Sequence, residues 1–464
     1  MPGGHPVTDL ARRYRVSTRR SAELALIIGA WLLGVFAWIL VDGATSNSSL
    51  GGWTSLISAG VLMLVTHTII RWQAPYADPI IFPVAAALNL FGLAMIHRLD
   101  VSAAQRAAAN ETAAPTPDVY LQIMWMAVGL VLLMVVLFIV EDHRQLQRIT
   151  WISGLVGIIL LFLPLLPGLG STVNGARLWI HIGGLTFQPG ELAKVSLTIF
   201  FAGFLVVRRH TLALVQTKIL GVGVPRPRDI GPLLAMWLFA LLVLILERDL
   251  GTSLLFFGVF IVMLYVAAGR RSWVLIGSGL LVVSGFLAYR AFGHVRIRFD
   301  VWLHPFADAN GNGYQIVQSL FGFANGGLFG TGWGQGYPDL VPFAKTDFIT
   351  SALGEELGLT GITALLLLYV ILIERGARAA VATRDPFGGL LAIGLTTVLA
   401  LQTFIVIGGV TRLIPLTGLT TPFLSYGGSS LVANYIILGL LLRISNAARR
   451  PEITMSTDMI EVNQ

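Results

Sequence analysis

The sequence predicts an all-α polytopic membrane protein with about twelve transmembrane helices. Two observations support this fold class. First, 55% of the 464 residues are hydrophobic and only 12% are charged, and the mean hydropathy is +0.78. Second, many apolar runs reach the roughly 20 residues that an α-helix needs to cross a bilayer core. These runs are continuous rather than alternating, which argues against a transmembrane β-barrel.

The expected spans follow the apolar runs in order along the chain. Most connecting segments are short, and one long loop lies at about 292–351. Long loops between spans are usually functional rather than simple connectors. The spans lie near 22–42, 53–71, 79–97, 119–140, 151–168, 191–208, 230–247, 251–268, 273–291, 352–373, 387–409 and 427–445.

Basic residues predict the orientation of these spans. They gather in alternate loops, and loops rich in Lys and Arg lie on the cytoplasmic side. Both termini are then cytoplasmic, and the alanine- and threonine-rich segment 98–118 on the outer side is interpreted as a plain spacer. The basic loops contain Arg12 to Arg20, Arg71, Arg144, Arg148, Arg208, Arg209, Arg226, Arg228, Arg270, Arg271, Arg375 to Arg384 and Arg443 to Arg450.

Composition also argues against several function classes. The net charge of +7 is explained by arginines at the inner membrane face, so we expect no nucleic-acid partner. The chain has no cysteine, which excludes a disulfide framework, a thiolate nucleophile and a cysteine metal site. The histidines do not cluster at metal-ligand spacing. The first apolar run is long enough to cross and lacks a suitable cleavage site, so we expect no cleavable signal peptide.

This topology places seven ionisable residues at the outer face. Charged groups in or near membrane segments are costly, so they are candidates for function. Two of them, Glu191 and Lys194, follow Pro189 at the start of a helix and share one helix face. They form either a cap with a surface ion pair or an ion pair that lines an outward cavity. The seven residues are Arg177, Glu191, Lys194, Asp249, Asp347, Glu355 and Arg412.

The turn at Glu247 to Asp249 joins two spans that are nearly back to back. It is either a solvated turn or a group of charges that need partners close to the bilayer. For Asp249 we expect a pairing with Arg248 or with Lys194. A second irregular outer segment, 411–431, carries Pro415 and Pro422 and is expected to be broken rather than helical.

The long outer loop carries Asp347 where it meets the next helix. Its first part contains the basic residues His294, Arg296 and Arg298, and its middle is rich in glycine. Neither a phosphate-binding P-loop nor a dinucleotide fingerprint is present. If the helix began at Asp347, that residue would share a face with Ser351 and Glu355. Asp347 is interpreted as a helix N-cap, as a catalytic base, or as both.

Taken together, these motifs resemble the SEDS family of peptidoglycan polymerases. The resemblance rests on F-Q-P-G-E-L-A-K at 187–194, D-L-G-T-S at 249–253, G-Y-Q-I-V-Q-S at 313–319, T-D-F-I at 346–349, E-E-L-G at 355–358 and S-Y-G-G-S-S at 425–430. The chain departs from the usual pattern at Gly190 and at Glu247 and Arg248, among other positions. None of the departures removes a proposed catalytic residue. The chain is more similar to the elongation-type members than to the division-type members.

The resemblance implies a domain organisation. It covers about residues 77–447, which form a ten-helix core with a large extracytoplasmic loop. Residues 1–76 form a basic cytoplasmic N-terminus and two extra helices, which occur in actinobacterial members. Residues 448–464 form a cytoplasmic tail. The implied location is the bacterial cytoplasmic membrane.

The resemblance also implies an activity and roles for site residues. The chain would be an inverting glycosyltransferase that polymerises lipid II at the outer face and releases undecaprenyl pyrophosphate. Asp347 would be the catalytic base. The supporting or pyrophosphate-binding residues would be Glu191, Lys194, Asp249, Arg177, Arg248, Glu355 and Arg412. A divalent cation, Mg²⁺ or Mn²⁺, would be able to assist.

Partners and alternatives complete the prediction. The resemblance implies lipid II, membrane lipids and a class B penicillin-binding protein as partners. The chain has no S-x-x-K transpeptidase motif of its own, so crosslinking is expected to come from another protein. One alternative class is a lipid II flippase, since broken helices and buried charges also occur in transporters. A transporter is expected to carry acids near mid-membrane, whereas these acids gather at one face. Another alternative is a scaffold that only recruits a transpeptidase.

Overall fold

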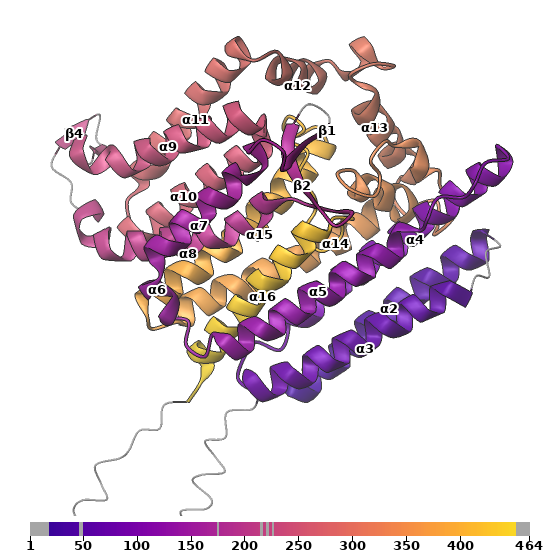
Figure 1. Cartoon of the computed structure of the whole chain (residues 1–464), viewed down its shortest axis with the longest axis horizontal. Helices are drawn as coiled ribbons and strands as arrows, with labels where there is room; N and C mark the ends of the chain where they lie inside the picture. Colours follow the sequence, from indigo (N-terminus) through magenta and orange to yellow (C-terminus); the bar gives the residue numbers. More distant parts are fainter. Residues whose placement is uncertain are drawn as a thin grey trace, which may run out of the picture.

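The structure is a computed structural model, and it describes residues 18–45, 50–173, 176–213, 217–219, 222–224 and 227–451. The basic residues Arg12, Arg13, Arg15 and Arg226, and residues 452–464 of the expected tail, lie outside the described residues. Among the described residues, ten helices are long and apolar enough to cross a membrane. The fold is therefore an all-α polytopic one, as the sequence predicts (Figure 1). The ten helices are α2 (Arg20–Thr45), α3 (Leu50–Gln73), α4 (Ile81–Ala109), α5 (Asp118–Ile139), α8 (Pro189–Ala213), α10 (Leu250–Ala268), α11 (Arg271–Ala291), α14 (Ile349–Ala382), α15 (Pro386–Val410) and α16 (Gly428–Arg449).

Two of the twelve expected spans are shorter as helices. The span expected at 151–168 is α7 (Thr150–Phe162), which follows the short α6 (Gln145–Arg148). It continues only through one 3₁₀ turn, η1 (Leu163–Leu165), because proline cannot extend an α-helix. The span expected at 230–247 is α9 (Pro227–Glu247), whose apolar part is Gly231–Glu247. By length and composition the described residues therefore support ten spans and two shorter apolar helices.

Two small antiparallel sheets were not predicted from the sequence. The first has the order β1-β2-β3, with β1 (Gly170–Val173), β2 (Ala176–Ile182) and β3 (Leu185–Phe187). Its second turn is formed by Gly183 and Gly184 at φ +56° and +84°, which is the backbone that tight hairpins favour. The other sheet pairs β4 (Thr217–Ile219) with β5 (Val222–Val224).

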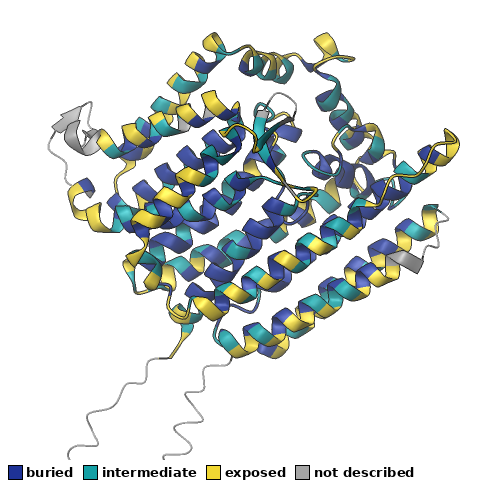
Figure 2. Ribbon diagram, in the orientation of Figure 1, coloured by how far each residue is buried: buried dark blue, intermediate teal, exposed yellow. Residues whose placement is uncertain are grey.

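The buried core lies in the middle of the helix bundle. In the most apolar stretches of α4 and α16, 94% and 83% of the residues are buried, whereas the value is 33% for α2 and 22% for α11. Figure 2 shows this as dark central helices with lighter helices around them. The outer helices carry many exposed apolar side chains, as expected of surfaces that face lipid.

Hydrogen bonds between the connecting segments sort the helix ends into two groups. At one end, Lys345 contacts Asp118 at the start of α5, and we call it the Asp347 end. At the other, Arg20 donates to Ala77 O at 2.6 Å and Tyr76 N donates to Asn446 Oδ1 at 2.8 Å, and we call it the Arg20 end. Figure 1 shows α12 and α13 at the Asp347 end, far from the first and last described residues.

Candidate active site

The long loop folds into short helices before it reaches Asp347. These are α12 (Gly293–Leu303), η2 (Pro305–Asp308), α13 (Tyr314–Gly326) and η3 (Pro338–Leu340). The chain then makes a turn in which Thr346 N and Phe348 N donate to Phe343 O at 3.0 and 3.2 Å. Because this turn closes on Phe343, the N-cap of α14 is Phe348. The N-cap interpretation of Asp347 is therefore wrong, and Asp347 does not extend the helix face of Ser351 and Glu355.

A cavity of about 410 Å³ opens beside Asp347. Its wall is built by α12, α13, the turn before α14, the end of α15 and the segment 411–427. Apolar and polar side chains both contribute, which suits a site that must hold a substrate and orient it. The polar lining consists of Arg298, Asn312, Gln315, Asp347 and Arg412, and the apolar lining includes Ile297, Val301, Ile316, Ile414 and Leu416.

Arg298 is a functional candidate that sequence reasoning noted but did not select. One guanidinium nitrogen, Nη1, donates to Leu416 O at 3.0 Å and to Thr417 O at 2.8 Å. A Cβ placed on Gly418 would lie 3.7 Å from Asp347 Oδ2 and 4.0 Å from Arg298 Nη2. The carboxylate and the guanidinium therefore flank the same glycine. Spacing alone could not show which of the loop's basic residues turns toward Asp347.

The electrostatic setting of Asp347 suits proton transfer. Burial raises the pKa of the Asp347 carboxyl to about 6, while the positive charge of Arg298 and a hydrogen bond with Thr346 oppose that rise. The nearby charge of Asp249 raises the pKa further. A carboxylate whose pKa lies close to neutral pH can accept a proton and still be mostly ionised.

Asp249 is a second acid at this end, and it caps a helix. It is the N-cap of α10 and accepts from Thr252 N at 3.0 Å and from Thr252 Oγ1 at 2.5 Å. Burial raises the pKa of Asp249, and the Thr252 hydrogen bonds and the charge of Arg298 oppose this. The ion pairs among the described residues do not include Asp249 with Arg248 or with Lys194, so those two expected pairings are not observed.

Glu191 and Lys194 form a buried ion pair rather than a surface pair. α8 begins at Pro189 as predicted, and Glu191 lies in its first turn. Lys194 Nζ lies 2.5 Å from Glu191 Oε2 and donates to Gln402 Oε1 at 2.7 Å. Gln402 Nε2 in turn donates to Thr420 O at 2.8 Å. Neither residue is among those that line the cavity, and the pair contacts the segment 411–427 through Gln402.

The segment 411–427 connects these groups. It is not helical, as its prolines predict. Ser425 Oγ donates to Thr346 O at 2.6 Å, and Tyr426 N donates to Lys345 O at 2.8 Å. The same segment holds Arg298 through the carbonyls of Leu416 and Thr417. The segment 411–427 thus positions both Arg298 and the turn that carries Asp347.

The remaining candidates occupy different places. Arg412 lines the cavity, and its guanidinium donates to Trp302 O and Leu303 O at 2.7 Å each. Glu355 accepts from Asn325 Nδ2 and Tyr337 N at 2.9 Å each, so it supports the long loop before α14. Arg177 in β2 donates to Leu166 O at 3.1 Å. Arg248 occupies the tight turn before α10 at φ +58°. Neither Arg177, Arg248 nor Glu355 is among the residues that line the cavity.

The interpretation of 98–118 as a plain spacer is wrong. α4 continues to Ala109, and Asp100 and Asp118 lie 2.5 and 2.7 Å from Lys345 Nζ. Burial alone would lower the pKa of Lys345, but the two carboxylates outweigh it and raise the pKa. Lys345 therefore stays charged and anchors the turn before Asp347. The partners are more than two hundred positions apart in sequence, so no local pattern revealed them.

The divalent cation expected from the resemblance stays a prediction. Within the part of the chain that the structure describes, no group of three or more His, Cys, Asp or Glu is arranged to hold a metal ion. Mg²⁺ is often held by only one or two carboxylates together with substrate phosphates. Asp347 is the carboxylate of the cavity lining that would serve such an ion.

Comparison with known proteins decides the family. Residues 79–450 match the FtsW/RodA/SpoVE family model, described as a cell cycle protein. The chain belongs to this family. It is 51% identical to the peptidoglycan glycosyltransferase RodA of Mycobacterium tuberculosis over 94% of this chain and 92% of that protein. It is 48% identical to RodA of Mycobacterium leprae over 94% of this chain and 92% of that protein.

Other members of the FtsW/RodA/SpoVE family are more distant. A probable peptidoglycan glycosyltransferase FtsW of Geobacter metallireducens is 34% identical over 79% of this chain and 94% of that protein. The fold is similar to a chain in a solved peptidoglycan synthase complex that coordinates polymerization and crosslinking (27% identity, TM-score 0.65, 81% of this chain and 99% of that chain). It is also similar to RodA of Thermus thermophilus (25% identity, TM-score 0.55, 81% of this chain and 98% of that chain).

Proposed function

We propose that this chain is a peptidoglycan glycosyltransferase of the RodA type, which polymerises lipid II for cell elongation. The observation that carries the proposal is the cavity in which Asp347 and Arg298 flank Gly418. The cavity thus provides a base and a cation close together, which the activity named for the mycobacterial relatives requires. The elongation type is favoured over the septal FtsW type because the RodA relatives are more identical over more of the chain.

In this proposal Asp347 is the general base. It takes a proton from the 4-hydroxyl of the acceptor N-acetylglucosamine, and the hydroxyl oxygen then attacks C1 of the donor N-acetylmuramic acid. The bond from C1 to the pyrophosphate breaks, so a single displacement inverts the α-linked donor to a β-1,4 product. A positioned base of this kind contributes roughly 10²- to 10⁴-fold to the rate. The raised pKa of Asp347 supports this role.

The leaving pyrophosphate requires positive charge. Arg298 and Arg412 both line the cavity and are held by backbone carbonyls, so they are the first candidates. Lys194 is buried with Glu191 and Gln402, and we assign it a supporting role. Arg177, Arg248, Asp249 and Glu355 also support the site in this proposal. A divalent cation, if it takes part, would add charge at the same place.

Membrane orientation and partners form part of the proposal. The loops at the Arg20 end carry most of the arginines, so we place that end in the cytoplasm and the Asp347 end outside. The twelve-span count follows if α7 and α9 also cross. Undecaprenyl pyrophosphate is then released at the outer face. A class B penicillin-binding protein is the proposed partner, and the similarity to a chain of a synthase complex supports this.

Purified protein with lipid II in detergent provides the test. We expect glycan strands from the wild-type chain, with or without the partner, and none from a folded Asp347→Ala protein. Strands from the folded Asp347→Ala protein would overturn the assignment of the base. Absence of strands from every sample, together with lipid II crossing vesicle membranes, would favour the flippase class instead.

A further inference from the structure

The two N-terminal helices lie before the residues that match the family model, which begin at residue 79. α2 nevertheless packs closely on α4, while α3 packs on α5 (Figure 1). Buried residues run along α2 from Arg20 to Val41, and its hydrogen bonds to the core lie near its two ends. At the Asp347 end, α2 contacts segments that in turn hold the active-site turn in place.

A histidine of α4 holds the outer end of α2. The ring of His97 stacks on Trp38 with a centroid distance of 3.8 Å and an angle of 10°. His97 Nε2 also lies 2.8 Å from Asp42 Oδ1. Gln105 Nε2 adds a hydrogen bond to Thr45 O at 3.3 Å. The two α2 side chains in these contacts are Trp38, which stacks on the His97 ring, and Asp42, which contacts its nitrogen. These contacts fix the position of α2 against α4.

The next residues of α4 hold the active-site region, and we call residues 97–102 the α4 platform. Arg98 Nε lies 2.8 Å from Glu356 Oε1 in α14, and Arg98 Nη2 donates to Gly336 O at 2.8 Å. Asp100 binds Lys345, two residues before Asp347. One short stretch of helix therefore contacts α2, α14 and the turn of Asp347.

A glycine-rich loop, residues 327–336, lies between α14 and α2. Thr331 N and Gly332 N donate to Glu355 O and Glu356 O at 3.0 Å each. Gly334 N donates to Glu356 Oε2 at 3.1 Å. These bonds hold the loop against the part of α14 that is interrupted at Gly358, where φ is +67°.

The opposite side of this loop rests on α2. A Cβ placed on Gly334 would lie 2.7 Å from Ala44 Cβ and 3.4 Å from Val41 O. Gly334 also has φ +78°, a backbone conformation that favours glycine. Any side chain at this position would push α2 and the loop apart.

We propose that α2 is a positioning element of the active site. It presses the glycine-rich loop onto α14 and holds the α4 platform, and these two supports fix the turn that carries Asp347. The proposal rests on the function proposed above, since it assigns α2 a role in that same reaction. A misplacement of the base of about 1 Å is enough to reduce catalysis by roughly 10²-fold.

A double-mutant cycle between α2 and the loop tests the contact. In the full chain, Gly334→Ala should lower kcat for lipid II polymerisation by roughly tenfold or more, with little change in KM, because the base is displaced and the substrate site is retained. Ala44→Gly alone should leave kcat close to wild type. The double variant should recover the part of the rate lost to the clash, because Ala44→Gly removes the Ala44 Cβ, while the strain at φ +78° remains. A wild-type kcat for Gly334→Ala, or no recovery in the double variant, would overturn the proposal.

Hydrogen exchange of residues 327–336 gives a readout that does not depend on activity. Asp42→Ala removes the acceptor for His97 and should speed exchange in the loop, whereas Asp42→Asn keeps an acceptor and should restore protection. Glu23→Gln, at the far end of α2, is the matched control and should leave exchange in the loop unchanged. Unchanged loop exchange in Asp42→Ala would contradict the proposal. Wild-type protein that makes no glycan strands would instead refute the proposed function, and the exchange data would still judge the role of α2.

Discussion

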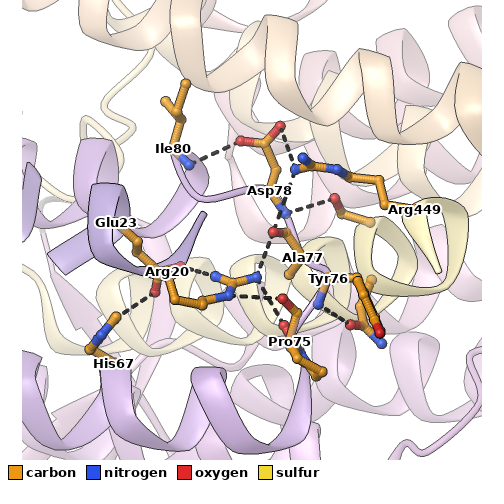
Figure 3. A network of polar contacts seen from close by, with 12 residues as sticks. Arg20, Glu23, His67, Pro75, Tyr76, Ala77, Asp78, Ile80 and Arg449 are labelled. Atoms are coloured by element: carbon orange, nitrogen blue, oxygen red, sulfur yellow. Dashed lines mark hydrogen bonds and ion pairs between the residues drawn. The ribbon is translucent and has the colours of Figure 1, made fainter. Parts of the chain in front are cut away.

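The two ends of the molecule both hold charged side chains away from solvent, buried for Arg20 and Glu23 and half-buried for Asp347 and Arg298, but they use them differently. At the Arg20 end, Arg20 donates to Pro75 O at 3.1 Å and to Ala74 O at 3.0 Å, and it also pairs with Glu23 (Figure 3). Glu23 contacts His67 Nδ1 at 3.0 Å. At the Asp347 end, Asp347 and Arg298 face a cavity and flank Gly418. Among the described residues, the ion pairs do not include either of these two.

This difference shows which buried charges indicate function. Burying a charge is costly unless other groups of the protein compensate it. The Arg20 network compensates its charges internally and links the start of α2 to the turn before α4. Next to it, Asp78 lies 3.5 Å from Arg449 (Figure 3). It also lies 3.6 Å from Arg375. At the Asp347 end, Asp347 and Arg298 face a cavity, and a bound substrate can supply further partner groups for their charges.

The largest expected effect is that of Asp347→Asn. The amide keeps the shape of the side chain but cannot accept a proton, so polymerisation should fall by roughly 10²- to 10⁴-fold. Strand formation from purified lipid II, compared at equal amounts of folded protein, measures this. A decrease of less than tenfold would mean that the cavity does not hold the base.

Arg298→Gln should have the next largest effect. It removes the cation that flanks Gly418 with Asp347, and loss of one such electrostatic contact costs about 10²-fold in rate. Steady-state rates over a range of lipid II concentrations measure this. Arg296→Gln is the matched control, because the exposed Arg296 side chain donates to Arg290 O at 3.4 Å, lies over the Tyr289 ring and is not among the cavity-lining residues. Equal losses in both variants would remove the special role of Arg298.

Glu191→Gln should mainly affect stability. It leaves the buried Lys194 without its carboxylate partner, and removing one partner of a buried pair costs roughly 3–5 kcal/mol. We expect a clear drop in Tm in detergent, with a smaller decrease in the rate per folded molecule. An unchanged Tm would show that the pair does not support the segment 411–427.

The smallest effect on activity is expected for Glu23→Gln at the Arg20 end. Glu23 faces Arg20 with one carboxylate oxygen and His67 with the other, so the amide keeps an acceptor for one of these contacts and the ion pair is lost. Tm should fall while the rate per folded molecule stays at the wild-type value. If polymerisation fell as strongly as in the Arg298 variant, the functional contrast between the two ends would be refuted.

The sequence predicted features that depend on local pattern. The membrane class followed from apolar runs, the start of α8 from Pro189, and the broken segment 411–427 from its prolines. Asp347 was selected because it follows a long polar loop between two apolar runs. The comparisons confirm the family that the motifs indicated.

Features that depend on distant contacts were not predictable. Asp100 and Asp118 bind Lys345 across more than two hundred positions. The alanine- and threonine-rich segment 98–118 therefore gave no local sign that it carries two residues that hold the site in place. Arg298 was one of several basic residues in its loop, and only the fold shows that it turns toward Gly418. The Asp347 turn closes on Phe343, and no sequence rule indicated that the helix would begin two residues later.

The pH dependence of polymerisation tests the central claim, which is that Asp347 is a base whose pKa is set by burial and by Arg298. Burial raises the pKa of Asp347 to about 6, and a base works only when ionised. The wild-type rate should therefore fall as the pH is lowered through about 6. In Arg298→Gln, loss of the positive charge raises the pKa of Asp347, so the same fall should begin at a higher pH. A rate that is flat across this range, or an identical profile for both proteins, would contradict the account.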